Sequence, residues 1–238
     1  MTTPLLSLRR ITAGYRGNVV LRDISLDLAE GSLAAIIGPN GHGKSTLLRT
    51  VSGLLPLRSG EIRFGTARID RLRPDEIVTK GVVHVPQGDM LFPEMTVLEN
   101  LQMGAYASPS PAETPRRLEM VFTLLPRLAE RRHQVASTLS GGERRMCGIG
   151  RGLMTEARLL MLDEPSLGLA PIIIDQIYML IGELRRERRT ILVVEENASR
   201  VADLADQLHL LDHGSFVWSG RGDELMARPE ILSTYLGG

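Results

Sequence analysis

The sequence predicts an α/β fold with a mostly parallel sheet that carries an inserted helical lobe near residues 90–150. Strand and helix patterns alternate from about residue 159 onward, which is typical of a parallel sheet covered by helices. The first third of the chain instead contains short strand patterns, and the stretch from Thr96 to about Gly152 is helical in character. These three observations indicate one α/β core interrupted by a helical insertion.

Short strands dominate the first third. Leu5–Ile11 and Val19–Leu28 alternate apolar and polar residues, which indicates strands with one buried face. Ser32–Ile37 is a buried strand that runs straight into a glycine-rich turn and then into a helical stretch, Lys44–Ser52. Further short strands are expected at Glu61–Phe64 and Val82–Val85.

Helices are expected in the middle of the chain at Val97–Met103, Pro115–Leu128 and Glu143–Leu153. The alternating segment that follows predicts strands at Leu159–Leu162 and Thr190–Val194, and helices at Ile172–Arg188 and Ala198–Asp206. A hairpin of Leu208–Leu211 and Phe216–Ser219, then short helices at Asp223–Ala227 and Pro229–Leu236, end the chain.

Composition limits the function classes. The chain has 238 residues, 43% of them hydrophobic, and zero net charge, so it can bury a large core and lacks the basic excess expected of a protein that coats nucleic acid. No apolar run reaches the roughly 18–20 residues of a membrane-spanning helix, and the N-terminus has no signal-peptide pattern. The single cysteine, Cys147, fits a reducing compartment and a packing role. We therefore expect a cytoplasmic chain that reaches a membrane only through a partner.

A phosphate-binding loop stands between the strand Ser32–Ile37 and the following helix. Gly38–Thr46 reads GPNGHGKST, a full G-x-x-x-x-G-K-[ST] pattern. Its glycines let backbone N–H groups turn toward phosphates, Lys44 would neutralise the β- and γ-phosphates, and the Ser45 hydroxyl would bind Mg²⁺. His42 occupies a variable position, where a tolerated substitution and a phosphate-facing role both stay open. The residues expected to bind nucleotide are Gly38, Pro39, Asn40, Gly41, His42, Gly43, Lys44, Ser45 and Thr46.

Two carboxylates end a later apolar strand. Leu159–Glu164 reads LLMLDE, and a strand tip beside the phosphate loop is where a second Mg²⁺ ligand should lie. Asp163 fits this role, while Glu164 is placed to orient or deprotonate the attacking water. Alone this pattern is weak, but together with the upstream loop it indicates ATP hydrolysis.

The segment Leu139–Glu143, LSGGE, decides the family, because it resembles the signature motif of ABC ATPases and precedes the aspartate strand by about twenty residues. A serine and two glycines at the start of a helix form an anion-binding N-terminus. The resemblance implies a P-loop NTPase core with an N-terminal antiparallel β subdomain. It also implies that Ser140, Gly141 and Gly142 act on the γ-phosphate held by a second subunit.

Two further residues are similar to family positions. Tyr15, 29 residues before Lys44 (44 − 15), resembles the aromatic residue that stacks on adenine; a surface tyrosine in a turn is the alternative. Gln87, at the end of the strand VVHVPQ, resembles the catalytic-site glutamine that touches Mg²⁺ and couples to the membrane partner. A buried glutamine at a strand end is the alternative there.

The resemblance covers residues 5 to 236 and implies one domain over residues 1–238. Within it, residues 1–90 and 153–238 would form the nucleotide-binding core and 91–152 the helical signature subdomain. The most similar subtype is the shorter ATP-binding subunit of branched-chain amino-acid importers, with urea and amide importers using similar subunits. The matching stretches are Val85–Leu101, Leu139–Met154, Leu162–Pro171 and Val193–Ala198.

This subtype implies ATP and Mg²⁺ as cofactors and a dimer with a second ABC ATPase subunit, identical or different. Transmembrane permease subunits would hold the chain at the inner face of the cell membrane, and a periplasmic or extracellular solute-binding protein would act indirectly; no nucleic acid is implied. Soluble ABC ATPases of DNA repair or translation are the alternative. Repair members carry long coiled coils or zinc-cysteine insertions, and translation members fuse two ATPase domains; these features are not seen in this sequence. A non-hydrolysing ATP sensor is a further alternative, against which Lys44, Asp163 and Glu164 argue.

Two positions depart from the general ABC pattern. Glu196 stands where most members have a histidine that contacts the γ-phosphate, and Ala170 stands where an aspartate is usual. The branched-chain subtype resembles this chain in lacking both residues. The departure at Glu196 puts in question how efficiently this chain's own ATP site hydrolyses.

Overall fold

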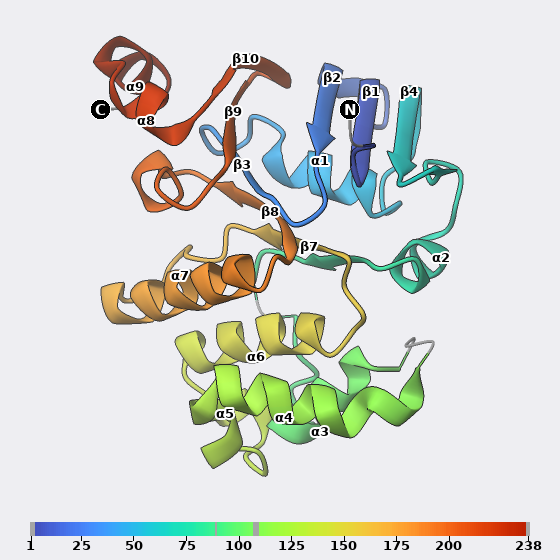
Figure 1. The fold of residues 1–238 in the computed structure, drawn as a ribbon, viewed down its shortest axis with the longest axis vertical. Helices are drawn as coiled ribbons and strands as arrows, with labels where there is room; N and C mark the ends of the chain where they lie inside the picture. The colour runs from blue at the N-terminus through green and yellow to red at the C-terminus, as the bar shows by residue number, and fades with distance from the viewer. Residues whose placement is uncertain (1–2, 89, 107–109, 237–238) are drawn as a thin grey trace.

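Two β-sheets and the helices that cover them form the described part of the chain, residues 3–88, 90–106 and 110–236 of the computed structural model (Figure 1). The smaller sheet has the strand order β2-β1-β4-β5, and all of its neighbouring strands are antiparallel. Its strands are β1 (Leu6–Tyr15), β2 (Asn18–Leu28), β4 (Leu57–Phe64) and β5 (Ala67–Arg68). This sheet confirms the antiparallel β portion expected near the N-terminus.

The larger sheet has the order β10-β9-β3-β8-β7-β6. Its strands are β3 (Leu33–Ile37), β6 (Val82–Val85), β7 (Leu159–Asp163), β8 (Thr190–Glu195), β9 (Gln207–Asp212) and β10 (Ser215–Gly220). Its neighbours are parallel except for the β9–β10 hairpin, which confirms the mostly parallel sheet.

The register of this sheet brings three strand ends together. Ile36 of β3 pairs with Val194 of β8, and Val194 in turn pairs with Asp163 of β7. Since ligands of open parallel sheets bind beyond the carboxyl ends of the strands, the segments that follow β3, β7 and β8 meet at one edge. The phosphate loop follows β3, and Glu164 follows β7.

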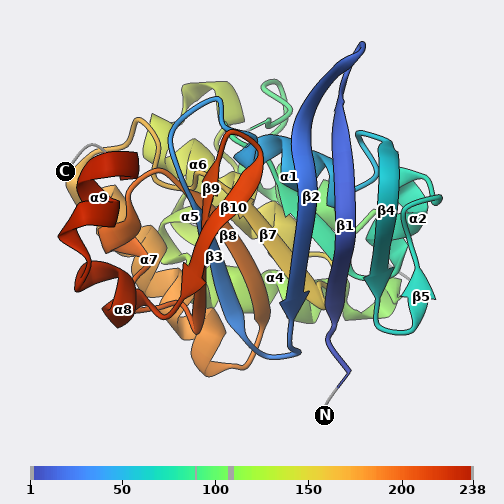
Figure 2. The same ribbon diagram turned by 90° about the horizontal axis from the view of Figure 1, so that it is seen from above.

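Alternate residues of the buried strands point to two separate cores. Leu33 and Ile37 of β3 pack in one core with α6 (Gly141–Leu153) and α7 (Pro171–Arg186). Ala34 and Ile36 pack in the other core with the helix that follows the phosphate loop and with the smaller sheet. Helix α1 (Lys44–Val51) therefore lies between the two sheets, as Figures 1 and 2 show.

The chain between β6 and β7 is helical and lies on the side of the larger sheet away from α1 (Figure 1). Its helices are α3 (Val97–Gly104), η1 (Pro111–Glu113), α4 (Thr114–Leu124), α5 (Pro126–Glu130), η2 (Ala136–Thr138) and α6 (Gly141–Leu153). The remaining helices are α2 (Pro74–Thr79), α7 (Pro171–Arg186), η3 (Ala198–Arg200), α8 (Gly222–Met226) and α9 (Pro229–Leu236).

Two expected helices differ from the structure, and one α-helix was not expected. The helix predicted over Pro115–Leu128 is divided at Leu125, because a residue before proline is disfavoured in helical conformation and Pro126 begins α5. The short helix α2 was missed.

The helix predicted over Ala198–Asp206 is only the 3₁₀ turn η3, followed by further turns. Asp206 leaves the helical path, since its N–H donates to the carbonyl of Leu33 and its carboxylate accepts the Leu33 N–H, both at 2.8 Å. Pairing with β3 therefore outweighs local helix propensity. Among the described residues, no helix is both long and apolar enough to cross a membrane.

Candidate functional site

The phosphate loop follows β3 and leads into α1. Gly38 sits at its start, where a Cβ atom would lie 2.2 Å from the carbonyl oxygen of Leu211, so only glycine fits. Gly43 precedes the helix with φ 110°, and no side chain caps the first turn of α1. The N–H groups of that turn have no intrahelical acceptor and form, with the helix dipole, a site suited to phosphate.

Lys44 closes the loop on itself. Its Nζ donates to the carbonyls of Gly38 and Pro39 at 2.8 and 3.1 Å and to Oδ1 of Asn40 at 3.3 Å. It also forms an ion pair of 3.0 Å with Oε1 of Glu164. The cation therefore lies in the loop where the phosphate charge is expected.

A pair of hard oxygen ligands lies beside Lys44. The Ser45 hydroxyl donates to Oδ1 of Asp163 at 3.0 Å, although the two residues are 118 positions apart. Asp163 is almost fully buried, and its Oδ2 lies 3.9 Å from Nε2 of His84. A hydroxyl and a carboxylate at this separation fit Mg²⁺, which prefers oxygen ligands and is held through few side chains beside a phosphate.

Glu164 is held in a strained conformation. Its φ is 44°, in the left-handed region that non-glycine residues seldom adopt, and its N–H donates to the carbonyl of Val194 at 3.0 Å. Oε2 of Glu164 accepts a hydrogen bond of 3.2 Å from Nε2 of Gln87. The structure thus brings together Lys44, Ser45, Gln87, Asp163 and Glu164, all expected from the sequence. All of these except Asp163 line a cradle, which is formed by Asn40, Gly41, Gly43, Lys44, Ser45, Thr46, Gln87 and Glu164.

Other expected site residues lie outside this cradle. Ser140 caps α6: its Oγ accepts from the N–H of Glu143 at 3.3 Å, and Oε2 of Glu143 accepts from the N–H of Ser140 at 2.9 Å. Burial raises the pKa of Glu143, but the bonds from Ser140 and the charge of Arg131 outweigh it and leave the pKa lowered. Gly141 is exposed, and Gly142 packs against Ile173, 2.9 Å from where its Cβ would lie. The helix start is thus ordered and open to an incoming group.

Tyr15 and His42 also point elsewhere. Tyr15 ends β1, is 40% exposed, and its hydroxyl accepts from Nη1 of Arg49 at 3.2 Å. Nδ1 of His42 lies 2.7 Å from Oδ1 of Asp212, so the imidazole turns from the cradle although its peptide belongs to the loop. Stacking of Tyr15 on adenine and a phosphate-facing role of His42 stay predictions.

Glu196 reaches the loop at another point. Its Oε2 accepts from Nδ2 of Asn40 at 2.9 Å, while Oδ1 of Asn40 accepts from Lys44. An acceptor group therefore lies beside the loop at the position where the sequence resemblance implied a histidine donor in most members.

Sequence reasoning missed Arg145 on α6. This buried guanidinium donates to the carbonyls of Pro86, Pro165 and Asp163 at 2.8, 3.2 and 2.6 Å, and also to that of Gly88. It ties the signature helix to the segments that carry Gln87 and Glu164. An arginine in the middle of an otherwise apolar and small helix face was the available signal.

Sequence reasoning also missed Glu195, the buried residue before Glu196. Its Oε1 accepts from the Tyr178 hydroxyl at 2.7 Å and from the N–H of Ser166 at 3.2 Å. Burial, and then the neighbouring carboxylate, raise the pKa of Tyr178. This pair holds the loop that follows Glu164.

The fold and the site define a P-loop ATPase, and comparisons with known proteins identify its family. The model of the ABC transporter family matches residues 21–167. The chain is 42% identical over 234 residues to the high-affinity branched-chain amino acid transport ATP-binding protein BraG of Pseudomonas aeruginosa, covering 98% of this chain and all of that protein. It is 34% identical to a probable branched-chain amino acid transport ATP-binding protein, LivF of Archaeoglobus fulgidus, covering 96% of this chain and 97% of that one.

Solved structures agree. The ADP conformation of MJ1267, an ATP-binding cassette of an ABC transporter, superposes with a TM-score of 0.87 at 29% identity and covers all of both chains. The chain therefore belongs to the ABC transporter family, whose ATP-binding proteins bind and hydrolyse ATP to power transport. The relatives give no support to a soluble repair or translation ATPase.

Proposed function

We propose that this chain powers an importer of branched-chain amino acids or related small solutes. The observation that carries the proposal is the 42% identity, over nearly the whole chain, to a branched-chain amino acid transport ATP-binding protein. The constellation of Lys44, Ser45, Asp163 and Glu164, in which all but Ser45 are buried, supports it, because a transport motor must hydrolyse ATP.

Mg²⁺ is proposed to bind between Ser45 and Asp163, with Gln87 nearby. When bound, the ion would neutralise charge on the phosphates. Phosphate would compete with Glu164 for Lys44, whose ammonium now lies 3.0 Å from that carboxylate. Glu164 would then orient water while Gln87 keeps it in place.

A second ATP-binding subunit, identical or different, is proposed to complete each site. Ser140 and Gly141 are exposed and absent from the lining of the cradle, which supports an action on a phosphate bound elsewhere. Residues 1–90 and 153–238 would bind nucleotide, while 91–152 would carry the signature helix to the other subunit.

The permease is proposed to contact a groove between the end of β6 and helices α3 and α6. Its lining includes Met90, Phe92, Met103 and Tyr106, which are 65%, 42%, 38% and 86% exposed. Large apolar side chains gathered on one exposed surface are typical of protein interfaces. Contact here, at the inner face of the membrane, would couple Gln87 to the permease.

The proposal is tested by reconstitution. The chain would be co-expressed with the permeases of its own gene neighbourhood, purified from membranes and placed in proteoliposomes with the solute-binding protein. We expect ATP-dependent uptake of labelled leucine. Uptake of urea and not of leucine would show that the proposed solute is wrong. Failure to co-purify with any permease would overturn the importer assignment.

The groove has a separate test. Tyr106→Asp should abolish co-purification with the permease while leaving nucleotide affinity intact. Met179→Asp provides the matched control, because Met179 is 61% exposed on α7, outside the groove. Equal effects of the two substitutions would show that the groove is not the contact.

A further inference from the structure

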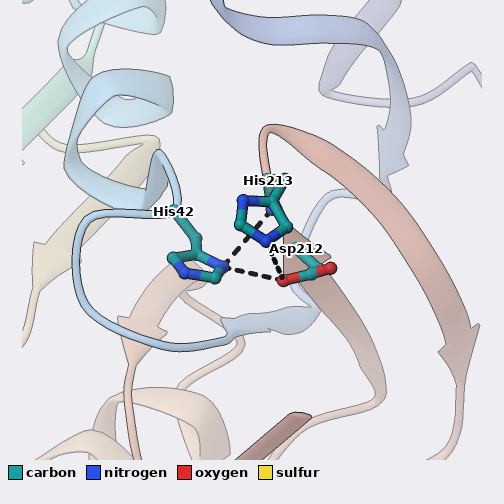
Figure 3. A group of neighbouring side chains, drawn as sticks. All are labelled: His42, Asp212 and His213. Carbon is teal, nitrogen blue, oxygen red and sulfur yellow. Dashed lines mark hydrogen bonds and ion pairs between the residues drawn. The ribbon is translucent and has the colours of Figure 1, made fainter.

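Three side chains outside the cradle converge where the phosphate loop meets the turn between β9 and β10. Figure 3 shows His42 approaching from the loop, Asp212 from the end of β9, and His213 from the turn that follows. Oδ1 of Asp212 lies 2.7 Å from Nδ1 of His42 and 3.9 Å from Nε2 of His213. Each of the three residues offers one ligand atom, and these three atoms all lie within 4.8 Å of one another. Ligand atoms of two imidazoles and one carboxylate thus lie close to one another.

The backbone holds this arrangement in place. The carbonyl of His42 accepts from the N–H of Gly214 at 3.1 Å, which joins the loop to the turn. Gly214 is required there, because a Cβ would lie 1.7 Å from the carbonyl oxygen of Val20. His213 adopts a φ of 43°, and its ring stacks on that of His42 with centroids 4.4 Å apart. The ligand atoms are therefore brought together before any ion binds.

We propose that His42, Asp212 and His213 bind a divalent transition-metal ion such as Zn²⁺. Two histidine nitrogens and one carboxylate oxygen, with a fourth position left to water, form a common zinc ligand set. The nitrogen ligands distinguish this site from the oxygen ligands of Ser45 and Asp163, which suit Mg²⁺.

Only small side-chain movements are needed. Ligand atoms of a tetrahedral zinc lie roughly 3.3 Å apart, given bonds of about 2.0–2.1 Å. The His213 side chain is 82% exposed and can rotate toward the other two, whose side chains are 22% and 19% exposed. The exposed side also gives the ion a path from solvent.

Bound metal would tie the phosphate loop to the β9–β10 turn. His42 belongs to the loop, yet its side chain is not part of the cradle lining. The ion would therefore restrain the loop backbone without occupying the place of the phosphates. Binding should stabilise the folded chain, because a ligand that binds only the folded state raises the melting temperature.

The test is zinc titration calorimetry on the full chain, free of affinity tag and nucleotide, with Co²⁺ absorption as a second measurement. We expect one ion per chain and a zinc-dependent rise in melting temperature. His42→Ala and Asp212→Asn should each weaken binding by at least about tenfold, since even residues that only orient ligands contribute about 10–100-fold. His213→Asn keeps a residue type that tolerates positive φ, so it tests the site even if the His42 variant unfolds.

Two controls separate this site from adventitious binding. His133→Ala removes an exposed histidine elsewhere, and Asp163→Asn removes the proposed Mg²⁺ carboxylate; both should leave zinc affinity unchanged. Absence of stoichiometric zinc would overturn the proposal. So would zinc binding that survives His213→Asn but is lost in Asp163→Asn.

Discussion

The Nζ of Lys44 lies 3.0 Å from Oε1 of Glu164, and both side chains are almost completely buried. The residue expected to neutralise phosphate and the residue expected to activate water are therefore paired with each other. Removing either partner leaves an uncompensated buried charge. When nucleotide binds, a phosphate would replace the Glu164 carboxylate as the anionic partner of Lys44, and that carboxylate would then be available to act on water.

Lys44→Ala should remove most nucleotide affinity, because the loop loses its cation and the charge-assisted bonds to phosphate. Calorimetric titration with ATP measures the effect. Lys80→Ala is the matched control, since Lys80 is the other lysine of the chain and is exposed. If Lys44→Ala bound ATP as tightly as Lys80→Ala, the role assigned to Lys44 would be wrong.

ATP hydrolysis by the isolated chain should depend on protein concentration. Ser140 and Gly141 are not part of the cradle lining, so the proposed composite site would need a second subunit. We expect activity per molecule to rise as the chain dimerises, followed in parallel by light scattering. Constant specific activity over a wide dilution, with the protein monomeric throughout, would contradict the composite site.

Acid should weaken the fold through His209. Burial lowers the pKa of His209 from 6.5 to about 4, and its Nε2 has no hydrogen-bond partner in the described structure. Above pH 6.5 the His209 ring is neutral in both the folded and the unfolded chain, so its protonation does not reduce the unfolding free energy. Between pH 6.5 and 4 only the unfolded chain takes up the proton, so the unfolding free energy falls by about 3 kcal/mol.

Urea unfolding at pH 7 and pH 4.5 measures this loss. His209→Gln should show a smaller difference between the two pH values than the wild type. His133→Gln, which changes an exposed histidine, should keep the wild-type difference. Equal differences in all three proteins would rule out His209 as the cause.

The sequence predicted the parts of the site that depend on local spacing. Gly38–Thr46 lies between a strand and a helix, and LLMLDE ends a strand, so Lys44 and Glu164 could be assigned roles. The contacts of Arg145 could not be predicted, because its acceptors are carbonyls on segments brought near it only by the order of β6 and β7 in the sheet. The same holds for His42 and Asp212, which are 170 positions apart.

The fold was misjudged where a tertiary contact outweighs local propensity. The pattern of Ala198–Asp206 suits a helix, but Asp206 pairs with Leu33 instead. The division between α4 and α5 is a different case, because Pro126 is visible in the sequence and disfavours a helical conformation of the residue before it.

Arg145→Met should destabilise the chain by about 3 kcal/mol, because several buried carbonyls lose a charged donor at once. Arg145→Lys should recover only part, since an ammonium lacks the planar fork that reaches separate acceptors. Denaturant unfolding measures both variants. Arg116→Met, whose side chain is 85% exposed, is the control; a comparable loss there would show that burial of Arg145 is not responsible.

The two composite sites of a heterodimer should hydrolyse ATP at different rates. One site would use Lys44, Asp163 and Glu164 of this chain, and the other would use the loop and glutamate of the second subunit with Ser140 and its glycines. In the first, Glu196 accepts a hydrogen bond from Asn40 at 2.9 Å and has no donor for the γ-phosphate when ionised. Losing one such donor costs on the order of 2.7–4 kcal/mol of transition-state stabilisation, roughly a hundredfold to a thousandfold in rate.

Turnover should therefore come mainly from the other site. In the assembled transporter, Glu164→Gln here should reduce ATPase activity less than the matching change in the second subunit; equal losses would show that the site with Glu196 hydrolyses normally. Glu196→Gln gives the complementary test, because its amide regains a donor and removes a negative charge near the phosphate. This test uses a transporter in which the glutamate of the second subunit is also replaced, so that only the site with Glu196 remains active. There, Glu196→Gln should raise the residual ATPase activity, and no rise would mean that Glu196 does not limit this site.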